Sequence, residues 1–314
     1  MRKIFLLLFQ LCVVYGFILG LASNIFGYSY TYEPLDYPGS VSGETRGINN
    51  LGTVVGWYSD GEIGHGYLYH KGTWTSFEYP GSGWTVAYGI NDSNKIVGWH
   101  DAGGFLYDAG TWTPLNYPGS YYTEVYDINN SDKIVGYYSG NNWKHHGFLY
   151  NNGTWTSLNY PGSIWTETYG INDSDKIVGF YIDTTYQGHG FLYDYDNDTW
   201  TSLDFDYPST FDTHAYNINN SGEIVGWYFD WDAPNSEYRG FLYDMNTSTS
   251  LDYPGTWVTS AYGINDAGRI VGEYLNYYTD DHGFVASPVS EPSTMLLLGS
   301  GIAGLAALRK RFKI

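Results

Sequence analysis

The amino-acid sequence predicts an all-β fold, a six-bladed β-propeller of four-stranded antiparallel blades. The main observation is a unit that recurs six times along the 314 residues. Each copy has a Tyr-Pro-Gly/Ser turn and, always 19 residues later, the glycine of an Ile/Val-Val-Gly segment. Successive copies are 42, 38, 43, 47 and 46 residues apart. Units of this size bury a core only by packing on their neighbours, which indicates a repeat architecture. The anchor tyrosines are Tyr37, Tyr79, Tyr117, Tyr160, Tyr207 and Tyr253, and the anchor glycines are Gly56, Gly98, Gly136, Gly179, Gly226 and Gly272.

Four short segments in each copy have the composition of β-strands. In the second copy they lie at residues 85–91, 95–99, 104–107 and 111–117. β-Branched and aromatic residues dominate these segments, and Gly, Asn, Asp or Pro bounds each of them. No stretch of the repeat region has convincing helical periodicity. We therefore expect four strands per repeat, called first to fourth in chain order.

Asparagine opens the turn between the first and second strands in every copy. Its side chain bonds back to the local backbone and tolerates left-handed conformations, which is the chemistry of a turn. Although several of these turns also read Asn-x-Ser/Thr, the turn explains them without glycosylation. The six residues are Asn49, Asn91, Asn129, Asn172, Asn219 and Asn265.

The two ends of the repeat region supply the halves of one blade. The region opens with a lone fourth strand, residues 32–37, and closes with a lone third strand, residues 283–286. Pairing of these strands would close the ring and hide edges that an open stack exposes. Leu35 and Phe284 are then expected on paired strands. An open β-solenoid is the alternative fold.

The length of the loop between the second and third strands varies among the copies. The spacing between the glycines of these two strands is 10, 6, 11, 11, 14 and 11 residues, whereas most other spacings are fixed. In a propeller these loops share one face with the Tyr-Pro turns, and variation confined to one face is typical of a binding side. Aromatic rings beside carboxylates suit sugars, because the ring stacks on C–H groups and the acid accepts hydroxyl hydrogens. The alternative is that the rings complete the blade cores. The candidate ligand-binding residues are Trp57, Trp99, Trp143, Tyr186, Trp231 and Tyr277.

Motifs for metal binding and catalysis are weak. Asp194, Asp196 and Asp198 resemble the start of a calcium loop, but Thr199 and Phe205 stand where glycine and glutamate are required. An enlarged turn is the simpler explanation, and a calcium site is the alternative. Four histidines precede the third-strand glycine, at positions that a propeller spaces around its ring, so we expect packing rather than a metal site. These are His65, His146, His189 and His282. The sequence shows no nucleophile elbow, phosphate loop or His-Glu-x-x-His motif, and we expect no cofactor and no enzymatic activity.

The N-terminus and the charge balance indicate an exported protein. Arg2 and Lys3 precede an apolar run up to Ala22, which predicts a signal peptide at residues 1–22, with an uncleaved anchor as the alternative. The one cysteine, Cys12, lies inside this segment, so the mature chain would have no disulfide. Residues 23–289 contain 8 Lys and Arg against 32 Asp and Glu, a net charge of −24. This balance argues against nucleic acid as a partner.

The C-terminal segment has three parts. A linker at residues 288–294 precedes an apolar stretch at 295–308, expected to be a transmembrane helix, and a basic tail follows at 309–314. This layout resembles the PEP-CTERM sorting signal of Gram-negative bacteria, in which an exosortase recognises and removes the tail. Glu291 and Pro292 match the sorting motif, whereas Ser290 stands where its first proline is usual. The resemblance implies export, transient anchoring in the membrane through the C-terminal helix, and a link to the cell envelope or its exopolysaccharide.

The body, the predicted propeller of residues 29–287, resembles HAF-type extracellular repeats over most of residues 29–286. The corresponding pieces are His189-Gly190-Phe191, Gly170-Ile171-Asn172 and Ile177-Val178-Gly179, with glycine in place of the family's alanine. We therefore expect a non-enzymatic, exosortase-sorted protein of the cell surface or extracellular matrix. It is expected to bind polysaccharide or another envelope component through the variable loops. The alternatives are a carbohydrate-active enzyme (a hydrolase or lyase) on the same scaffold and a purely structural scaffold without a ligand.

Overall fold

The computed structural model describes residues 29–141, 143–204, 210–231, 237–275 and 281–289. The chain divides into two compact units, one of residues 32–287 and one of residues 1–31 with 288–314. Few residues of the terminal segments (1–31 and 288–314) are described. Among them, the Val289 N–H donates a hydrogen bond of 2.8 Å to the Ser29 carbonyl. The larger unit carries the repeats.

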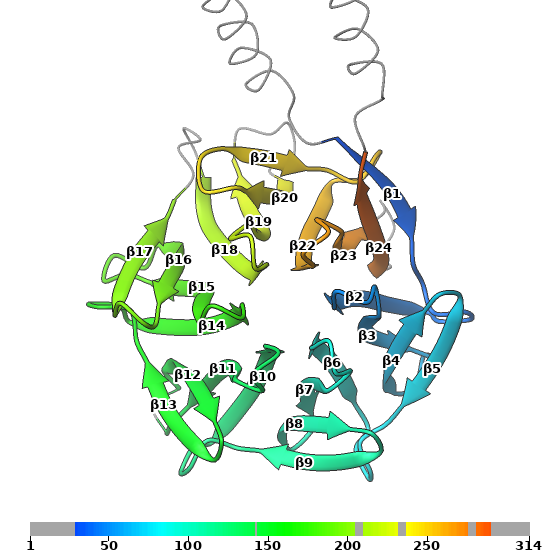
Figure 1. The fold of residues 1–314 in the computed structure, drawn as a ribbon, viewed down its shortest axis with the longest axis horizontal. Coiled ribbons are helices and arrows are strands. Elements are labelled where there is room, and N and C mark those ends of the chain that lie inside the picture. The colour runs from blue at the N-terminus through cyan, green and yellow to red at the C-terminus, as the bar shows by residue number, and fades with distance from the viewer. Residues whose placement is uncertain (1–28, 142, 205–209, 232–236, 276–280, 290–314) are drawn as a thin grey trace, which may run out of the picture. The chain divides into compact units, whose positions relative to one another are not determined.

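Six four-stranded units surround a central axis like the blades of a propeller (Figure 1). Four of them are separate sheets, and the fifth and sixth are joined by one parallel pair, Tyr238 with Val258. Within each unit the first three strands pair antiparallel in chain order. In the first five units the fourth strand also pairs antiparallel with the third. The expected all-β architecture of four-stranded antiparallel sheets is therefore confirmed. The first three units are β2 (Ser42–Ile48), β3 (Val54–Ser59), β4 (Gly64–His70) and β5 (Thr73–Phe77); β6 (Thr85–Ile90), β7 (Ile96–His100), β8 (Gly103–Asp108) and β9 (Thr111–Leu115); and β10 (Tyr122–Ile128), β11 (Ile134–Ser139), β12 (His145–Asn151) and β13 (Thr154–Leu158).

The remaining units complete the ring. They are β14 (Trp165–Ile171), β15 (Lys176–Ile182), β16 (Gly188–Asp194) and β17 (Thr199–Leu203); β18 (Thr210–Ile218), β19 (Ile224–Asp230), β20 (Glu237–Tyr243) and β21 (Ser248–Leu251); and β22 (Val258–Ile264), β23 (Ile270–Leu275), β24 (Asp281–Pro288) and β1 (Tyr30–Pro34). In each unit the first strand lies nearest the axis and the fourth lies outermost (Figure 1).

The last unit is shared between the two ends of the repeat region. β1 lies beside β24 in the sheet. The Leu35 N–H donates to the Gly283 carbonyl at 2.8 Å, and the Gly283 N–H donates to the Asp36 carboxylate at 3.0 Å. Leu35 and the residue next to Phe284 are thus hydrogen-bonded neighbours, as the ring closure requires.

The core lies between neighbouring units and depends on the anchor glycine. One cluster joins Val97 and Leu115 of the second unit to Val125 and Phe148 of the third. A methyl group on Gly98 would lie 1.9 Å from the Val86 carbonyl oxygen and 2.9 Å from the Phe105 ring, so no other residue fits there without displacing the backbone. The equivalent third-strand rings are fully buried: Tyr67, Phe105, Phe148, Phe191, Phe241 and Phe284.

The anchor tyrosines that lie in the described residues each pack on the next unit. Tyr37 stacks on Tyr58 with ring centroids 3.7 Å apart, and Tyr117 stacks on Tyr138 at 3.6 Å. Tyr160–Tyr181 and Tyr253–Tyr274 repeat this pair at 3.7 Å. The turn therefore recurs because its tyrosine connects adjacent units.

Candidate functional site

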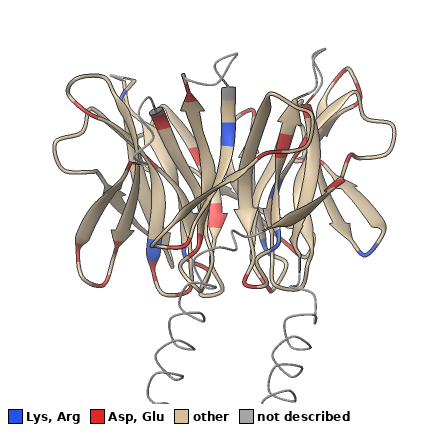
Figure 2. Ribbon diagram, turned by 90° about the horizontal axis from the view of Figure 1, so that it is seen from above, with Lys and Arg blue, Asp and Glu red and all other residues tan. Residues whose placement is uncertain are grey.

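Antiparallel pairing places the loops on two opposite faces of the ring, which Figure 2 shows from the side. We call the face with the loops between second and third strands and the Tyr-Pro turns the variable-loop face. We call the face with the Asn turns and the turns between third and fourth strands the asparagine face. The loops between second and third strands are residues 60–63, 101–102, 140–144, 183–187, 231–236 and 276–280.

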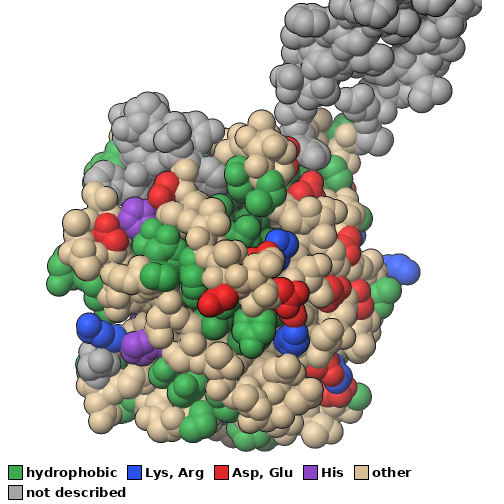
Figure 3. Space-filling model, turned by 60° about the vertical axis from the view of Figure 1, so that its left-hand side comes forward, with side chains coloured by type: hydrophobic (Ala, Val, Ile, Leu, Met, Phe, Trp, Pro, Cys, Tyr) green, Lys and Arg blue, Asp and Glu red, His purple; other side chains and the backbone are tan. Residues whose placement is uncertain are grey.

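Large apolar side chains are exposed mainly on the variable-loop face. Tyr186 is 82 % exposed, Trp143 is 62 % and Trp231 is 55 %. Among the described residues of the asparagine face the corresponding set is smaller, namely Leu51, Tyr195 and Met245. The full set on the variable-loop face is Val41, Trp84, Tyr121, Trp143, Tyr186, Trp231, Tyr238 and Trp257. Figure 3 shows the outer side of the ring, where hydrophobic side chains reach the surface among acidic and basic ones.

Five of the six candidate ligand-binding residues lie in the described part of the chain, and they fall into two groups. Trp143, Tyr186 and Trp231 lie in the loops, and two of them contact a ring of their own unit: Trp143 meets Tyr121 edge-on at 4.8 Å, and Trp231 meets Phe229 at 4.8 Å. They therefore occupy separate positions around the face.

Trp57 and Trp99 lie in β3 and β7 rather than in the loops, and both are half-buried. The Trp57 ring is 5.6 Å from Trp84, and the Trp99 ring is 6.4 Å from Tyr122. Trp57 thus contacts the residue directly before β6, and Trp99 contacts the first residue of β10, so each packs on the next unit. Tyr277 lies outside the described residues.

Carboxylates in the variable loops are held by backbone N–H groups. Asp60 accepts bonds from Glu62 and Ile63, and these bonds lower the pKa of its carboxyl to about 2. Gln187 and Thr185 donate to Asp183 and likewise lower its pKa to about 2. These groups stay ionised at any physiological pH.

The four third-strand histidines have the expected packing role. His65 stacks on Tyr58 at 4.7 Å and its Nδ1 lies 2.7 Å from Glu78. The same contacts recur at His146 with Asn159, at His189 with Asp204 and at His282 with Asp36. Arg239 replaces the histidine in the fifth unit and pairs with Asp252 at 3.1 Å.

A β-bulge turns one side chain of each first strand toward the axis. The register shifts at the same place in every first strand, as between Thr45 and Gly47 or between Ala87 and Gly89. Bulges re-aim a side chain in this way. Arg46 occupies the bulge in the first unit, and tyrosine occupies it in the other five. Together with Asn217 these residues line one small cavity; they are Arg46, Tyr88, Tyr126, Tyr169, Tyr216 and Tyr262. The Arg46 guanidinium lies 3.8 Å from the centroid of the Tyr262 ring.

Carboxylates lie two residues before several of these bulges and are satisfied internally. Glu124 accepts hydrogen bonds from the hydroxyls of Tyr88, Tyr122 and Tyr137 at 2.7–2.9 Å. Glu44 pairs with Arg46. Nearby, burial and the charge of Glu44 raise the pKa of Glu273 to about 8.

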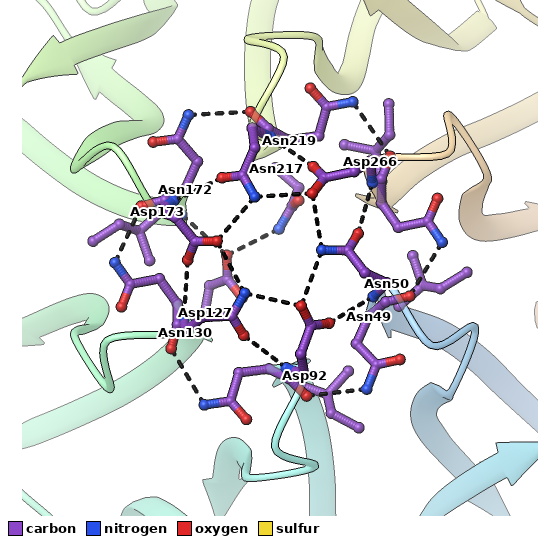
Figure 4. Close-up of a pocket in the computed structure, with 18 of the residues that line it drawn as sticks. Asn49, Asn50, Asp92, Asp127, Asn130, Asn172, Asp173, Asn217, Asn219 and Asp266 are labelled. Atoms are coloured by element: carbon purple, nitrogen blue, oxygen red, sulfur yellow. Dashed lines mark hydrogen bonds between the residues drawn. The ribbon is translucent and has the colours of Figure 1, made fainter.

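Two rings of hydrogen bonds surround the axis on the asparagine face (Figure 4). In the outer ring, the side-chain amide of each turn asparagine donates to the backbone carbonyl of the equivalent asparagine in the next unit, at 3.0–3.3 Å. Its Oδ1 accepts two N–H groups of its own turn, as Asn49 does from Leu51 and Thr53.

Asparagine and aspartate alternate in the second ring. Asn130 Nδ2 donates to the carboxylates of both Asp92 and Asp173 at 2.9 Å, and backbone N–H groups complete the pattern. The six members are Asn50, Asp92, Asn130, Asp173, Asn220 and Asp266. Every carboxylate therefore has two amide donors, and the ring stabilises closure of the axis.

A cavity of about 70 Å³ opens beside these rings, and Asp127 lies in its wall (Figure 4). The carboxylate of Asp127 accepts bonds from the Ile128 and Ile171 N–H groups and from Asn217 Nδ2. Burial nevertheless raises the pKa of Asp127 to about 7.

The calcium candidates are spread over a turn and engage protein donors. Asp194 accepts from Lys176 Nζ at 3.1 Å and from Asn197, and Asp198 accepts from the Tyr193 hydroxyl at 2.9 Å. Among the described residues, no group of three or more His, Cys, Asp or Glu side chains is arranged to hold a metal ion.

The residues around the axis, namely those at the bulges and in the two hydrogen-bonded rings, are the main feature that sequence reasoning missed. Their signal is readable: the residue before each Gly/Asp/Asn-Ile-Asn is Tyr in five copies and Arg46 in one, and the residue after the turn asparagine alternates between Asn and Asp. Periodicity places these residues in strands and turns. The β-bulge that turns the strand residues toward the axis cannot be recognised from the alternation of apolar and polar residues along a strand.

The expected signal peptide (1–22), sorting motif (Glu291 and Pro292), C-terminal helix (295–308) and basic tail (309–314) lie outside the described residues. In the part of the chain that is described, no helix is long and apolar enough to cross a membrane.

Two family models match parts of the chain. The PEP-CTERM protein-sorting motif matches residues 288–311, which confirms that the tail carries this sorting signal. This motif implies an exported, surface-sorted protein processed by an exosortase. A second model, "Protein of unknown function (DUF3466)", matches residues 160–254. Neither match names the HAF repeats, which stay a prediction, and a comparison with curated proteins finds no match.

Solved structures resemble the fold at low sequence identity. TolB from Acinetobacter baumannii is 12 % identical with a TM-score of 0.52; the match covers 75 % of this chain and 63 % of TolB, so less than two thirds of TolB's length is spanned. A fungal lectin from Aleuria aurantia, described as a six-bladed β-propeller, is 13 % identical over 84 % of this chain and 99 % of the lectin, with a TM-score of 0.47. A mutant of AofleA from Arthrobotrys oligospora is 10 % identical over 83 % and 90 %, with a TM-score of 0.48. The first likeness supports the fold alone, and scores under 0.5 carry no argument about ligands.

Proposed function

We propose that this chain is an exported, non-enzymatic repeat protein that binds polysaccharide of the cell envelope or extracellular matrix through its variable-loop face. The sorting motif supports delivery to the surface. The closed six-unit ring supports a role as a rigid platform, because its loops project from fixed positions around one axis.

The observation that carries the proposal is the concentration of exposed rings on the variable-loop face. Trp143, Tyr186 and Trp231 are each more than half exposed and lie in three different units. Exposed aromatic side chains away from an interface are unfavourable in water, and their gathering on one face is typical of a binding surface. Flat rings stack on the C–H faces of sugars.

Loop carboxylates add the polar half of such a surface. Asp60 is exposed and Asp183 is half-buried, and both are ionised, so their carboxylate oxygens can accept hydrogen bonds from hydroxyl groups. Because the rings belong to different units, a long polymer can engage several of them at once. Weak contacts then add up to useful affinity by multivalency.

Binding to an array of polysaccharides tests this proposal. The purified protein is expected to bind at least one polymer, and Trp143→Ala and Tyr186→Ala are each expected to weaken that binding about tenfold, the loss of one stacked ring. Tyr195→Ala on the asparagine face is the matched control and is expected to bind normally. Absence of binding to every polymer, with unchanged Tm in their presence, would remove the proposal.

We propose further that the apolar segment at 295–308 holds the protein in the membrane until the tail is removed. A chain truncated after residue 294 is expected in the soluble fraction, whereas the full chain is expected with membranes. Sedimentation of the truncated chain with membranes would show that another segment is the anchor.

A carbohydrate-active enzyme is the second candidate function, and one observation favours it. The pKa values of Glu273 and Asp127, both near the axis, are raised toward neutrality, as those of general acids often are. Both groups already accept bonds from protein donors, which places binding first. Release of reducing ends or unsaturated products from a bound polymer, abolished by Glu273→Gln, would establish the enzyme instead.

A further inference from the structure

We propose that the ligand of the variable-loop face carries protonated amino groups, as a partly de-N-acetylated hexosamine polymer does, and is not a uronate-rich polymer. This inference rests on the proposed function and adds the chemical class of the ligand. Three properties of the face support it: the sign of its charge, the permanence of that charge and the exposed rings beside it.

Acidic side chains dominate the described part of the variable-loop face. The lysine and arginine residues there are Lys144 and Arg239, and Arg239 is held by Asp230 at 3.3 Å and Asp252 at 3.1 Å. Histidines also lie on this face: the His65 ring is 3.3 Å from Asp60, and the His189 ring is 3.5 Å from Asp183. The described acidic residues of the face are Asp36, Asp60, Glu62, Glu78, Asp101, Asp183, Asp204, Asp212, Asp230, Asp252 and Asp281. A polyanion approaching this face meets repulsion from most of the units, whereas a polycation is attracted by them.

The positive charges of the repeat region gather elsewhere. Arg46 is half-buried near the axis, and five further bases lie in or beside the turns of the asparagine face: Lys71, Lys95, Lys133, Lys176 and Arg269. Figure 2 shows the blue segments mainly toward one edge of the ring. Three of these lysines pair with aspartates near them, as Lys95 does with Asp132 at 2.7 Å. The variable-loop face is therefore left negative without an internal counter-charge of comparable size.

The loop carboxylates remain charged wherever an amine is charged. Backbone N–H groups hold the pKa values of Asp60 and Asp183 at about 2. The carboxylate of Asp101 accepts the Gly83 N–H at 2.6 Å, which fixes it in the adjoining loop. An ammonium group thus meets ionised oxygens throughout the neutral range, and its own deprotonation limits the interaction at high pH.

The exposed rings suit a cationic sugar better than a neutral one. The edge-on pair of Trp143 and Tyr121 presents two aromatic surfaces at 4.8 Å, with both side chains more than 60 % exposed. An ammonium group over such a ring gains a cation–π attraction in addition to the stacking of the sugar itself. The aromatic rings favour an amino sugar through cation–π attraction, and the carboxylates favour it through charge attraction, so two independent interactions select this ligand.

A series of polymers with one backbone isolates the amino group. We would measure binding of the full-length protein, in detergent, to a β-linked hexosamine polymer that is fully N-acetylated, the same polymer after partial de-N-acetylation, and that product after re-acetylation, with a uronate polymer alongside. At about pH 6 the de-acetylated polymer is expected to bind about tenfold or more tightly than the two acetylated forms. The preference is expected to vanish at about pH 9, where amines lose their proton, and to weaken in roughly 0.5 M salt.

The outcomes separate this inference from the proposed function. Equal or tighter binding of the acetylated or the uronate polymer overturns the amino-group inference and leaves polysaccharide binding standing. Binding of none of the polymers overturns both.

Poly-lysine and two variants test for simple charge attraction. Trp143→Ala and Tyr121→Ala are expected to weaken binding of the de-acetylated polymer about tenfold while leaving poly-lysine binding unchanged, with Tyr195→Ala as the control for both. If poly-lysine binds as tightly as the amino polymer and neither ring variant has an effect, the face is a non-specific cation surface and the inference is wrong.

Discussion

Asn265 in the last repeat donates a hydrogen bond of 3.1 Å from its side-chain amide to the backbone carbonyl of Asn49 in the first repeat, 216 residues earlier. Five equivalent bonds link the other pairs of adjacent units. The asparagine that shapes each turn therefore also joins that turn to the next unit. Ring closure is supported at the axis as well as at the outer strands.

Asn265→Ala tests this double role. The substitution leaves the Ala267 and Arg269 N–H groups without their acceptor and removes the donor to Asn49. We expect a loss of about 3 kcal/mol in the free energy of unfolding, because the Asn265 side chain is buried. The corresponding fall in Tm is roughly 6–12 °C. Asn141→Ala, in an exposed loop, is the control, and an equal effect of the two variants would refute the role of the ring.

Replacing Asn130 by aspartate tests the alternation of amides and carboxylates. Asn130→Asp removes the two donors to Asp92 and Asp173 and sets three carboxylates side by side. We expect destabilisation of about 3 kcal/mol at neutral pH, recovered in part near pH 4 as the cluster takes up protons. Asn130→Ala removes the donors without adding charge, so its effect should not depend on pH in this way. Chemical unfolding at the two pH values measures both.

Arg46 and Glu44 form a pair in which the guanidinium stands where the other five units have tyrosine. Arg46→Tyr restores the tyrosine of those bulges but leaves the Glu44 carboxylate without its partner. We expect a cost of about 3 kcal/mol for this single change. Adding Glu44→Val, which copies Val86 of the second unit, should recover most of it. A double-mutant cycle with no recovery would show that Arg46 acts through Tyr262 and Tyr88 rather than through Glu44.

The raised pKa of Asp127 predicts a dependence of stability on pH. Its pKa is about 7 in the folded protein against an ordinary value of 3.8 for an aspartate, so the folded state holds its proton more tightly. The stabilisation from this proton is complete below about pH 4 and is lost as the pH rises through about 7. The free energy of unfolding of the wild type, minus that of Asp127→Asn, should therefore fall by about 2–3 kcal/mol between pH 5 and pH 8. A constant difference would mean that the hydrogen bonds from Ile128, Ile171 and Asn217 keep the carboxylate ionised throughout.

The sequence sufficed for the strands, their order and the joining of the two ends. Spacing alone identifies the anchors, because a glycine such as Gly98 and a ring such as Phe105 must meet at one place in every unit. It also sufficed for the turn asparagines, whose local chemistry is independent of the rest of the chain. Their bonds to the next unit could not be predicted, since these depend on how closely the units approach the axis.

The candidate site could be predicted only in part. Loop-length variation pointed to the face on which Trp143, Tyr186 and Trp231 are exposed, because insertions that vary must lie outside the core. The same argument grouped Trp57 and Trp99 with these loops, although Trp99 ends the strand predicted at 95–99; both lie in strands and pack toward the next unit. The reason is that the second strand continues beyond the glycine of Val-Val-Gly, by three residues in the first unit and by two in the second.

Oxidative footprinting tests the binding face most directly, because both faces carry exposed reactive side chains. Trp143, Tyr186 and Trp231 report on the variable-loop face, and Tyr195 and Met245 report on the asparagine face in the same sample. With a saturating polysaccharide ligand, oxidation of the first three is expected to fall several-fold while that of Tyr195 and Met245 stays unchanged. Protection of Tyr195 and Met245, with Trp143, Tyr186 and Trp231 still oxidised, would contradict the assignment.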